Sequence, residues 1–296
     1  MIRIGTRGSR LALAQTKTVL YNLKARGIEA EPVIIKTKGD KVTDRGLHQI
    51  GGYGVFVREL DNAILSGEID AAVHSMKDIP AQRPAGLVTA AVLRRDPPFD
   101  FMVVEKPLDE LYTIGTSSLR RRAQLLRYYH NHPEMEIKSL RGNIDTRLSK
   151  LESGEYDGIV LAEAGLCRLG IAVPGFRLPA DSFVPSPNQG TIAVVSRDTP
   201  QIRAVFAPLN DPRTAFDTAI ERAVMEELGG GCFTPLGVYS QGGRLLAEVL
   251  SLDGKRAERV TADNLTPELA REIGKELRIK AAPLIEEALK ESRRIE

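Results

Sequence analysis

Residues 114–122, with the sequence IGTSSLRRR, predict a buried strand, a turn of small residues and the start of a helix. Backbone N–H groups at a helix start, together with the hydroxyls of Ser117 and Ser118, attract anions. Successive helical residues rotate by about 100°, so the three arginines do not all face one ligand. The stretch predicts an anion site, although a serine N-cap before a surface-charged helix fits it equally well.

Two other stretches repeat this pattern, namely 139–147 (SLRGNIDTR) and 5–10 (GTRGSR). Any one of the three fits a plain strand–helix junction. All three lie at the carboxyl ends of predicted strands, the edge at which open α/β sheets bind ligands. Together they favour one basic cleft.

Strands and helices alternate through the first two thirds of the chain. The predicted strands are 2–5, 33–37, 71–74, 87–93, 101–104, 114–116, 137–140 and 158–162. The predicted helices between them include 11–25, 56–66, 119–129 and 144–152. This βαβ order predicts an α/β fold with mostly parallel sheets covered by helices on both faces.

Two breaks in composition, RRDPP at 94–98 and VPSPNQG at 184–190, bracket one α/β unit. Two crossings are what a chain needs to leave a first domain and return to it, as in periplasmic-binding-protein-like folds with ligand in the cleft. We expect domain 1 at residues 1–94, completed by 190–208, and domain 2 at 98–187. A smaller C-terminal α+β domain follows at 212–296.

The C-terminal region supports that last expectation. A helix begins near Pro212 and stops at the triple glycine 229–231. Asp253-Gly254 predicts the turn of a hairpin. A second helix begins at Thr266-Pro267 and is interrupted or kinked at Pro283.

The charge distribution indicates a small polyanionic ligand. The net charge is only +2, and the chain has no Trp for base stacking, so nucleic acid is not expected as a partner. Arginines outnumber lysines 28 to 13, and arginine binds carboxylates in a bidentate way.

Metal and disulfide chemistry are not expected. Two cysteines are too few for a disulfide framework or a thiolate metal site, and the four histidines have no ligand spacing. The chain has no apolar run of membrane-spanning length, and its N-terminus lacks the apolar core of a signal peptide. We therefore expect a soluble cytoplasmic protein.

Two further segments contain candidate chemistry. AVHSMKDIP at 72–80 places Lys77 and Asp78 just past a buried strand, where they form either a local ion pair or part of the cleft. GGGCFTP at 229–235 places Cys232 on a glycine-rich loop, as a nucleophile or an attachment point. Cys167, in the helix-like stretch 163–169, is expected to be an inert buried packing residue.

The combination of these segments resembles the porphobilinogen deaminase (hydroxymethylbilane synthase) family along nearly the whole chain. The segments that carry the resemblance are IGTRGS (4–9), AVHSMKD (72–78), GTSSLRR (115–121), SLRGN (139–143), TRL (146–148) and GGC (230–232). Their occurrence in this order is much more specific than any one of them.

The resemblance implies a three-domain transferase with one dipyrromethane cofactor in the cleft, joined by a thioether to Cys232. Such an enzyme condenses four porphobilinogen molecules, releases ammonia and, after hydrolysis, frees hydroxymethylbilane for tetrapyrrole (haem-type) biosynthesis. A monomer acting on this small molecule alone is expected, with neither nucleic acid nor a membrane as partner.

The resemblance also implies roles for individual residues. Asp78 matches the catalytic carboxylate that faces the pyrrole nitrogens. The cofactor-binding positions are Ser9, Lys77, Ser118, Arg120, Arg121, Arg141, Arg147 and Arg168. The substrate-binding positions are Arg7, Ser9, Arg141, Arg147 and Gln189, with Ser75, Thr116 and Ser117 as weaker candidates. Every ring carries two carboxylates, so bidentate cations suit the growing chain, and a fixed carboxylate suits the positive charge left when ammonia departs.

Two positions depart from the family pattern. The loop 51–54 reads GGYG, with Tyr53 where members often have Lys, which removes a cation there. Ser186-Pro187-Asn188 replaces the usual small apolar residues before Gln189, which predicts a different crossover geometry.

Two rival functions fit parts of the same pattern. A non-catalytic binder of small anions would need the arginines but neither Asp78 nor a thiol on an added domain. A thiol-dependent transferase using Cys232 would need a nearby histidine base. The visible absorbance and the intact mass of the protein distinguish all three.

Overall fold

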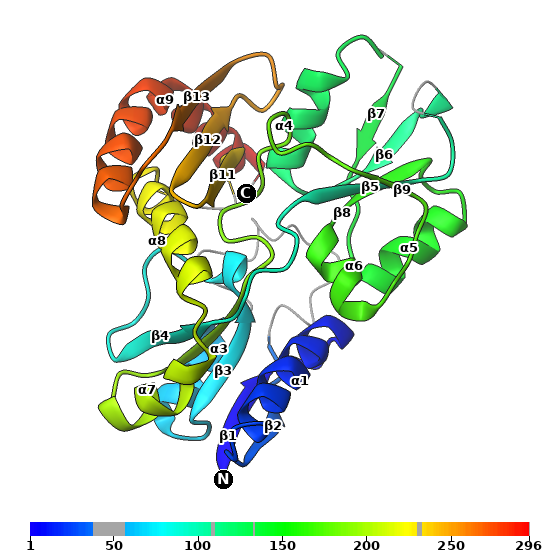
Figure 1. Cartoon of the computed structure of the whole chain (residues 1–296). Helices are drawn as coiled ribbons and strands as arrows, with labels where there is room; N and C mark the ends of the chain where they lie inside the picture. The colour runs from blue at the N-terminus through cyan, green and yellow to red at the C-terminus, as the bar shows by residue number, and fades with distance from the viewer. Residues whose placement is uncertain (38–56, 108–109, 133, 230–232, 296) are drawn as a thin grey trace. The chain divides into compact units, whose positions relative to one another are not determined.

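The computed structural model describes residues 1–37, 57–107, 110–132, 134–229 and 233–295 (Figure 1). The chain divides into two compact units. Unit 1 consists of residues 1–96 and 190–217, and unit 2 of residues 97–189 and 218–296. The finer division into three domains stays a prediction.

Unit 1 is built on a five-stranded sheet with the order β2-β1-β3-β10-β4. Its strands are β1 (Ile2–Thr6), β2 (Ala30–Ile34), β3 (Ala71–Ser75), β4 (Leu87–Val92) and β10 (Ile192–Arg197). Strands β2, β1 and β3 are parallel, whereas β10 is antiparallel to both β3 and β4. The carboxyl ends of β1 and β3 therefore lie at the same edge of the sheet.

Helices cover both faces of this sheet, because successive strand residues point to opposite sides. The helical elements are α1 (Arg10–Lys24), α3 (Arg58–Ser66), η2 (Met76–Asp78), α7 (Pro200–Phe206) and η4 (Ala207–Leu209). Val73 and Val194 pack on one face with residues of α1 and α7. Ala72 and Val195 pack on the other face with residues of α3.

Unit 2 contains a second five-stranded sheet, with the order β7-β6-β8-β5-β9. Its strands are β5 (Asp100–Val104), β6 (Thr113–Gly115), β7 (Glu136–Lys138), β8 (Gly158–Ala162) and β9 (Gly175–Arg177). β6 is parallel to β7 and β8, and β5 is antiparallel to β8 and β9. The carboxyl ends of β7, β6 and β8 thus lie side by side.

A helix follows each of those three strand ends. The helices are α4 (Leu119–Tyr128), α5 (Ile144–Glu152) and α6 (Glu163–Leu169). Met102 and Val160 pack on the sheet face that also buries Leu125 of α4, and Val103 and Ile159 pack on the opposite face. Asp100 lies two residues before Met102 on β5, so its side chain points to the α4 face.

Unit 2 also contains a three-stranded antiparallel sheet, β11-β12-β13. Its strands are β11 (Leu236–Gln241), β12 (Arg244–Leu250) and β13 (Ala257–Ala262), and α9 (Pro267–Ile295) follows them. The helix α8 (Pro212–Glu227) precedes them, and its residues 212–217 belong to unit 1. The predicted hairpin joins β12 to β13, and a Cβ at Gly254 would lie 2.3 Å from the Ala123 carbonyl oxygen of α4. α9 continues through Pro283, so the interruption considered from the sequence is absent.

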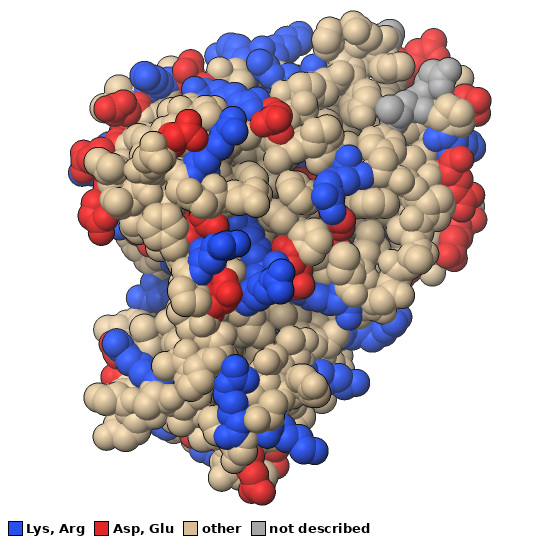
Figure 2. Space-filling model, viewed as in Figure 1, with Lys and Arg blue, Asp and Glu red and all other residues tan. Residues whose placement is uncertain are grey.

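The predicted α/β fold class with an added smaller part is confirmed, because two five-stranded sheets are packed with helices and a three-stranded antiparallel sheet is added to them. The expectation of mostly parallel sheets is wrong, since both five-stranded sheets are mixed. The apolar runs at residues 101–104 and 191–196 indicate strands buried on both faces, but their composition does not report strand direction. Figure 2 shows Lys and Arg interspersed with Asp and Glu on the face it presents.

Candidate active site

The two basic strand–helix junctions of unit 2 are neighbours in space. The hydroxyl oxygen of Ser117, after β6, lies 2.9 Å from that of Ser139, after β7. Ser117 also donates a hydrogen bond to the Leu140 carbonyl oxygen at 2.7 Å. The parallel pairing of β6 with β7 therefore brings the starts of α4 and α5 together, as the sequence predicted.

The start of α4 is held by its own hydroxyls. Ser118 is the N-cap and accepts a hydrogen bond from the Arg121 backbone N–H at 3.4 Å. Thr116, which is buried, accepts one from the Ser118 N–H at 3.2 Å. The N-cap reading of Ser118 is thus correct, but the helix it caps is not simply surface-charged.

Gly142 shapes the start of α5. Its φ of +109° is a left-handed conformation, and a Cβ there would lie 2.8 Å from the Thr146 side chain. Both constraints require glycine. The N-cap of α5, Asn143, makes no side-chain capping bond, so this helix start presents backbone N–H groups suited to an anion.

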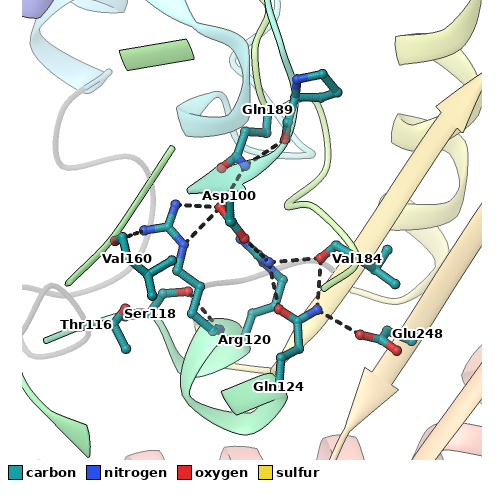
Figure 3. A network of polar contacts seen from close by, with 11 residues as sticks. Asp100, Thr116, Ser118, Arg120, Gln124, Val160, Val184, Gln189 and Glu248 are labelled. Carbon is teal, nitrogen blue, oxygen red and sulfur yellow. Dashed lines mark hydrogen bonds and ion pairs between the residues drawn. The ribbon is translucent and has the colours of Figure 1, made fainter. Parts of the chain in front are cut away.

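Arg120 and Arg121 both pair with one carboxylate, that of Asp100 on β5, and Figure 3 shows Arg120 pointing toward it. Arg120 Nη1 lies 2.7 Å from Asp100 Oδ2, and Arg121 Nη2 lies 2.7 Å from Asp100 Oδ1. Arg121 also donates from Nε to Asp100 at 3.1 Å and from Nη1 to the Val160 carbonyl at 2.8 Å. All three charged side chains are buried.

Burial alone would raise the pKa of Asp100, but the charges of Arg120 and Arg121 and their hydrogen bonds hold it well below its ordinary value. Gln189 contributes as well, donating from Nε2 to Asp100 Oδ1 at 2.9 Å and to the Pro98 carbonyl at 2.8 Å. That amide nitrogen is therefore already used within unit 2. The predicted substrate role of Gln189 stays untested.

Arg147, in α5, lies beside this pair without an acid of its own. Its Nε donates to the Gly142 carbonyl at 2.8 Å, and no described carboxylate forms an ion pair with it. Burial and the charge of Arg121 lower the pKa of Arg147 to about 10. Burial, and the neighbouring Arg120, also lower that of Arg121. We call Arg120, Arg121 and Arg147 with Asp100 the anion cluster, because its three guanidiniums suit the binding of anions.

Arg141 and Arg168 are half-buried in the same unit. Arg141 follows β7 directly before Gly142, so it lies at the edge that carries the anion cluster. Arg168 lies in the last turn of α6, at the end of that helix away from the strand edge.

In unit 1, the residues after β1 and β3 lie at one sheet edge. Ser9 is the N-cap of α1 and accepts from the Ala12 N–H at 3.3 Å. Gln15 of α1 donates to the Ser75 hydroxyl at 2.7 Å, which ties the end of β3 to that helix. Arg7 and Lys77 are half-buried at this edge.

Asp78 ends the short helical turn η2 and is exposed. The turn is anchored on either side by Met76 and Ile79, both buried in the core. The Asp78 carboxylate forms no hydrogen bond or ion pair with Lys77 or with any other described residue. The simple ion-pair reading of these neighbours is therefore wrong for the described structure.

Behind this edge lies a buried histidine that the sequence did not single out. Burial, with the charges of Arg83 and Arg7, lowers the pKa of His74 to about 3, so the imidazole is neutral. Arg83 pairs with buried Asp61 of α3. Arg7 and Arg83 both lie close enough to act on His74, so this edge of unit 1 is basic.

Three predicted features fall outside the described residues or were wrong. Cys232 and the loop around Tyr53 lie outside the described residues. Cys167 is exposed on α6, so the expectation of a buried packing residue is wrong, although the helix is correct. Within the described ranges, no three His, Cys, Asp or Glu side chains gather as metal ligands, and no helix is long and apolar enough to cross a membrane.

Comparison with known proteins identifies the family. The family model of the porphobilinogen deaminase dipyromethane cofactor binding domain matches residues 2–203, and that of the C-terminal domain matches residues 215–282. Probable porphobilinogen deaminases of Methanosarcina acetivorans and Methanosarcina mazei are 53% and 51% identical to this chain over 304 residues. The alignments cover 97% of this chain and 94% and 95% of those proteins.

A solved periplasmic substrate-binding protein of an ABC transporter from Coxiella burnetii is also similar, at 13% identity and a TM-score of 0.42. It covers 73% of this chain and 94% of its own. From the two family models and the near-complete relatives, the chain belongs to the porphobilinogen deaminase family.

Proposed function

We propose that this chain joins four porphobilinogen molecules head to tail on a dipyrromethane cofactor and releases hydroxymethylbilane for tetrapyrrole synthesis. The family membership supports the reaction, and the cofactor-binding domain matched at residues 2–203 supports the cofactor. In each step the aminomethyl carbon of a substrate bonds to the free carbon of the preceding ring. The amine leaves as ammonia, and that ring carbon loses its proton.

The excess positive charge of the anion cluster supports our assignment of its arginines as binders of ligand carboxylates. Three guanidiniums lie close together with one carboxylate, that of Asp100, in direct contact. A neighbouring cation disfavours the charged form of an arginine, and an added anion restores it. Porphobilinogen carries one acetate and one propionate, so each ring brings two carboxylates to this charge.

Arg147 is the clearest of these binders, because neither Nη atom has a partner among the described residues. Arginine pairs with a carboxylate through two parallel N–H bonds. The adjacent α5 helix start offers backbone N–H groups to the same ligand. Arg141 lies at the same edge, and we assign it the same task. In unit 1, we assign the binding of ligand carboxylates to Arg7, Ser9 and Lys77.

The donor set fits a dipyrromethane, which carries carboxylates and needs no metal ligand from the protein. When bound, the cofactor supplies the free pyrrole carbon that accepts the first substrate. We assign its attachment to Cys232, the position that the resemblance to the family implies, and give no such role to Cys167, which is exposed on α6.

Asp78 is assigned the catalytic role. Positive charge develops on the pyrrole nitrogen as ammonia leaves, and a fixed carboxylate stabilises it. The exposed Asp78 carboxylate has no described partner that would compete for this charge. Its backbone is nevertheless fixed, since Met76 and Ile79 are buried on either side.

The intact mass of the purified protein tests the proposal. The wild type should exceed its sequence mass by two linked pyrrole rings, and Cys232→Ser should lose both that excess and turnover. Cys167→Ser is the matched control and should keep both, although Cys167 is exposed. A fully active protein of unmodified mass would end the proposal. Size-exclusion chromatography tests the monomeric state that the family suggests, and the cytoplasmic location stays a prediction.

A further inference from the structure

The hydrogen bonds of the anion cluster continue into the three-stranded C-terminal sheet (Figure 3). Arg120 Nη1 donates to Oε1 of Gln124, one helical turn further along α4, at 2.9 Å. Gln124 Nε2 donates to Glu248 Oε1 at 2.8 Å and to the Val184 carbonyl at 2.9 Å. Glu248 is on β12, so two residues 124 positions apart connect this sheet to Arg120.

Glu248 is an unusual residue for its position. It lies in the stretch RLLAEVL of β12 and is 1% exposed. Burial raises the pKa of Glu248, whereas the hydrogen bond from Gln124 and the charge of Arg259, whose Nη1 lies 3.8 Å away, lower it. An apolar residue of similar size at this place would avoid the desolvation of a charge. The acid is therefore not explained by stability of the sheet.

The surroundings of Gln124 permit only one orientation of its amide. Oε1 faces a guanidinium, which only donates, and Nε2 faces two oxygens that only accept. Rotating the amide by 180° would place N–H against N–H and oxygen against oxygen. Glu248 and Val184 thus fix Gln124, and Gln124 in turn is one of three acceptors of the Arg120 Nη1 group, beside Asp100 and the Val184 carbonyl.

Arg120 and Arg121 share the Asp100 carboxylate, so the position of Arg120 affects that of Arg121. Arg120 occupies Asp100 Oδ2, which leaves Oδ1 for the Nε and Nη2 atoms of Arg121. Without Arg120 at Oδ2, the carboxylate would be held only at Oδ1, by Gln189 and Arg121, and a shift of the carboxylate would change its two bonds with Arg121. Arg121 is the member of the cluster whose charge acts on Arg147.

We propose that Glu248 and Gln124 are positioning residues of the anion cluster, holding Arg120, Asp100 and Arg121 in the arrangement that binds ligand carboxylates. The inference rests on the proposed function of that cluster. Neither residue is assigned any contact with substrate or cofactor. The C-terminal sheet would thereby set the affinity of an arginine cluster built on a different sheet of unit 2.

The test is Glu248→Leu in the full-length, cofactor-loaded enzyme. Leucine suits an apolar strand, so the melting temperature should not fall. Gln124 then keeps the Val184 carbonyl as its single acceptor and is held less firmly. The KM for porphobilinogen should rise, by up to about tenfold, with little change in kcat, since carboxylate binding is weakened in ground and transition states alike. The fraction of protein carrying the cofactor, read from the intact mass, should fall when loading is limited by time.

Three further variants keep the test decisive. Glu258→Leu, on the neighbouring strand β13, removes a side chain that makes no described hydrogen bond and should change neither KM nor loading. Gln124→Glu alone places two carboxylates together and should raise KM. Exchanging the pair, as Gln124→Glu with Glu248→Gln, restores the donor and acceptor between positions 124 and 248 but not the bond to the Val184 carbonyl, so it should reverse part of the rise in KM.

An unchanged KM and normal loading in Glu248→Leu would overturn the inference, as would a KM change that merely follows a lower melting temperature. Failure of the exchange to improve on Gln124→Glu would also count against it. Arg147→Leu separates this result from the proposed function. If Arg147→Leu is impaired and Glu248→Leu is normal, only the positioning role fails, whereas a normal Arg147→Leu contradicts the binding role of the cluster itself.

Discussion

Asp78 in unit 1 and Arg121 in unit 2 have opposite surroundings. Asp78 is exposed and without a described partner, and only its backbone is anchored. Arg121 is 7% exposed, and all three of its guanidinium nitrogens donate hydrogen bonds. In the proposed function, the carboxylate that meets a charge formed during the reaction has no described partner, whereas the cations that hold several carboxylates are fixed by hydrogen bonds.

The difference predicts that the two residues fail in different ways when they are replaced. Loss of the free carboxylate should affect turnover and leave stability unchanged. Loss of a fixed cation should affect both, because Asp100 is buried and depends on it. Arg147 is intermediate, since it is a cation of the cluster but has no acid partner in the described part of the chain.

Arg121→Leu should have the largest effect. It breaks the hydrogen bonds to Asp100 and Val160 and leaves a buried carboxylate short of one counter-charge. Removing one partner of a buried ion pair costs about 3–5 kcal/mol of folding free energy. Chemical denaturation should show this loss, and cofactor loading should fall with it. A variant of wild-type stability would contradict the buried-pair description.

Asp78→Asn should rank next, and its effect should be on turnover alone. Losing one preorganised electrostatic group lowers kcat by about 10²–10³-fold. The melting temperature and the cofactor mass should be unchanged, because Asp78 has no described partner to lose. Asp78→Glu should retain more activity than Asp78→Asn, since it keeps the charge. Near-normal turnover in a folded, loaded Asp78→Asn protein would refute the catalytic assignment.

Arg147→Leu should weaken ligand binding without the instability of Arg121→Leu. Loss of a charged hydrogen bond costs about 1.5–3 kcal/mol, which corresponds to roughly 10- to 150-fold in rate or affinity. Thermal unfolding should be unchanged or shifted slightly upward, because a cation beside Arg121 is removed. Steady-state kinetics and calorimetry measure the two quantities separately. An unfolding temperature that drops as far as that of Arg121→Leu would remove the distinction between them.

Glu248→Gln should give the smallest effect, visible in the pH dependence of stability. Burial raises the pKa of Glu248 above its ordinary 4.5, so ionisation disfavours the folded state and the wild type loses stability as pH rises from about 4.5 through the raised value. The glutamine variant lacks that loss. Its stability relative to wild type should therefore be greater at pH 8 than at pH 4. Asp100, with a lowered pKa, has the opposite sign and contributes stability that is lost in acid. A difference independent of pH would contradict the buried charge.

Local features of the candidate site were predictable from the sequence, whereas its long-range partners were not. The helix starts at Ser9 and Ser118 follow from strand, turn and cap signals within a few residues. Asp100 meets arginines 20 and 21 positions away, and Gln124 meets Glu248 at a separation of 124. Only the fold brings such residues together.

A signal for the buried acids was nevertheless present. Asp100 begins the strand DFMVV, and Glu248 interrupts LLAEVL. An acid inside an apolar strand is rarely buried unless it is paired, so each indicates a distant partner without identifying it. The exposure of Cys167 had no such signal, because the short α6 does not reveal which of its faces meets the core.

The mass distribution of the protein after brief mixing with porphobilinogen tests the division between Asp78 and the anion cluster most directly. Asp78→Asn should remain at the cofactor-loaded mass, with few or no substrate-derived units added while the wild type completes a turnover. Arg147→Leu should add units but accumulate partly extended covalent species, since carboxylates that arrive later lack a binder. Identical distributions in the two variants, or complete extension by Asp78→Asn, would contradict it.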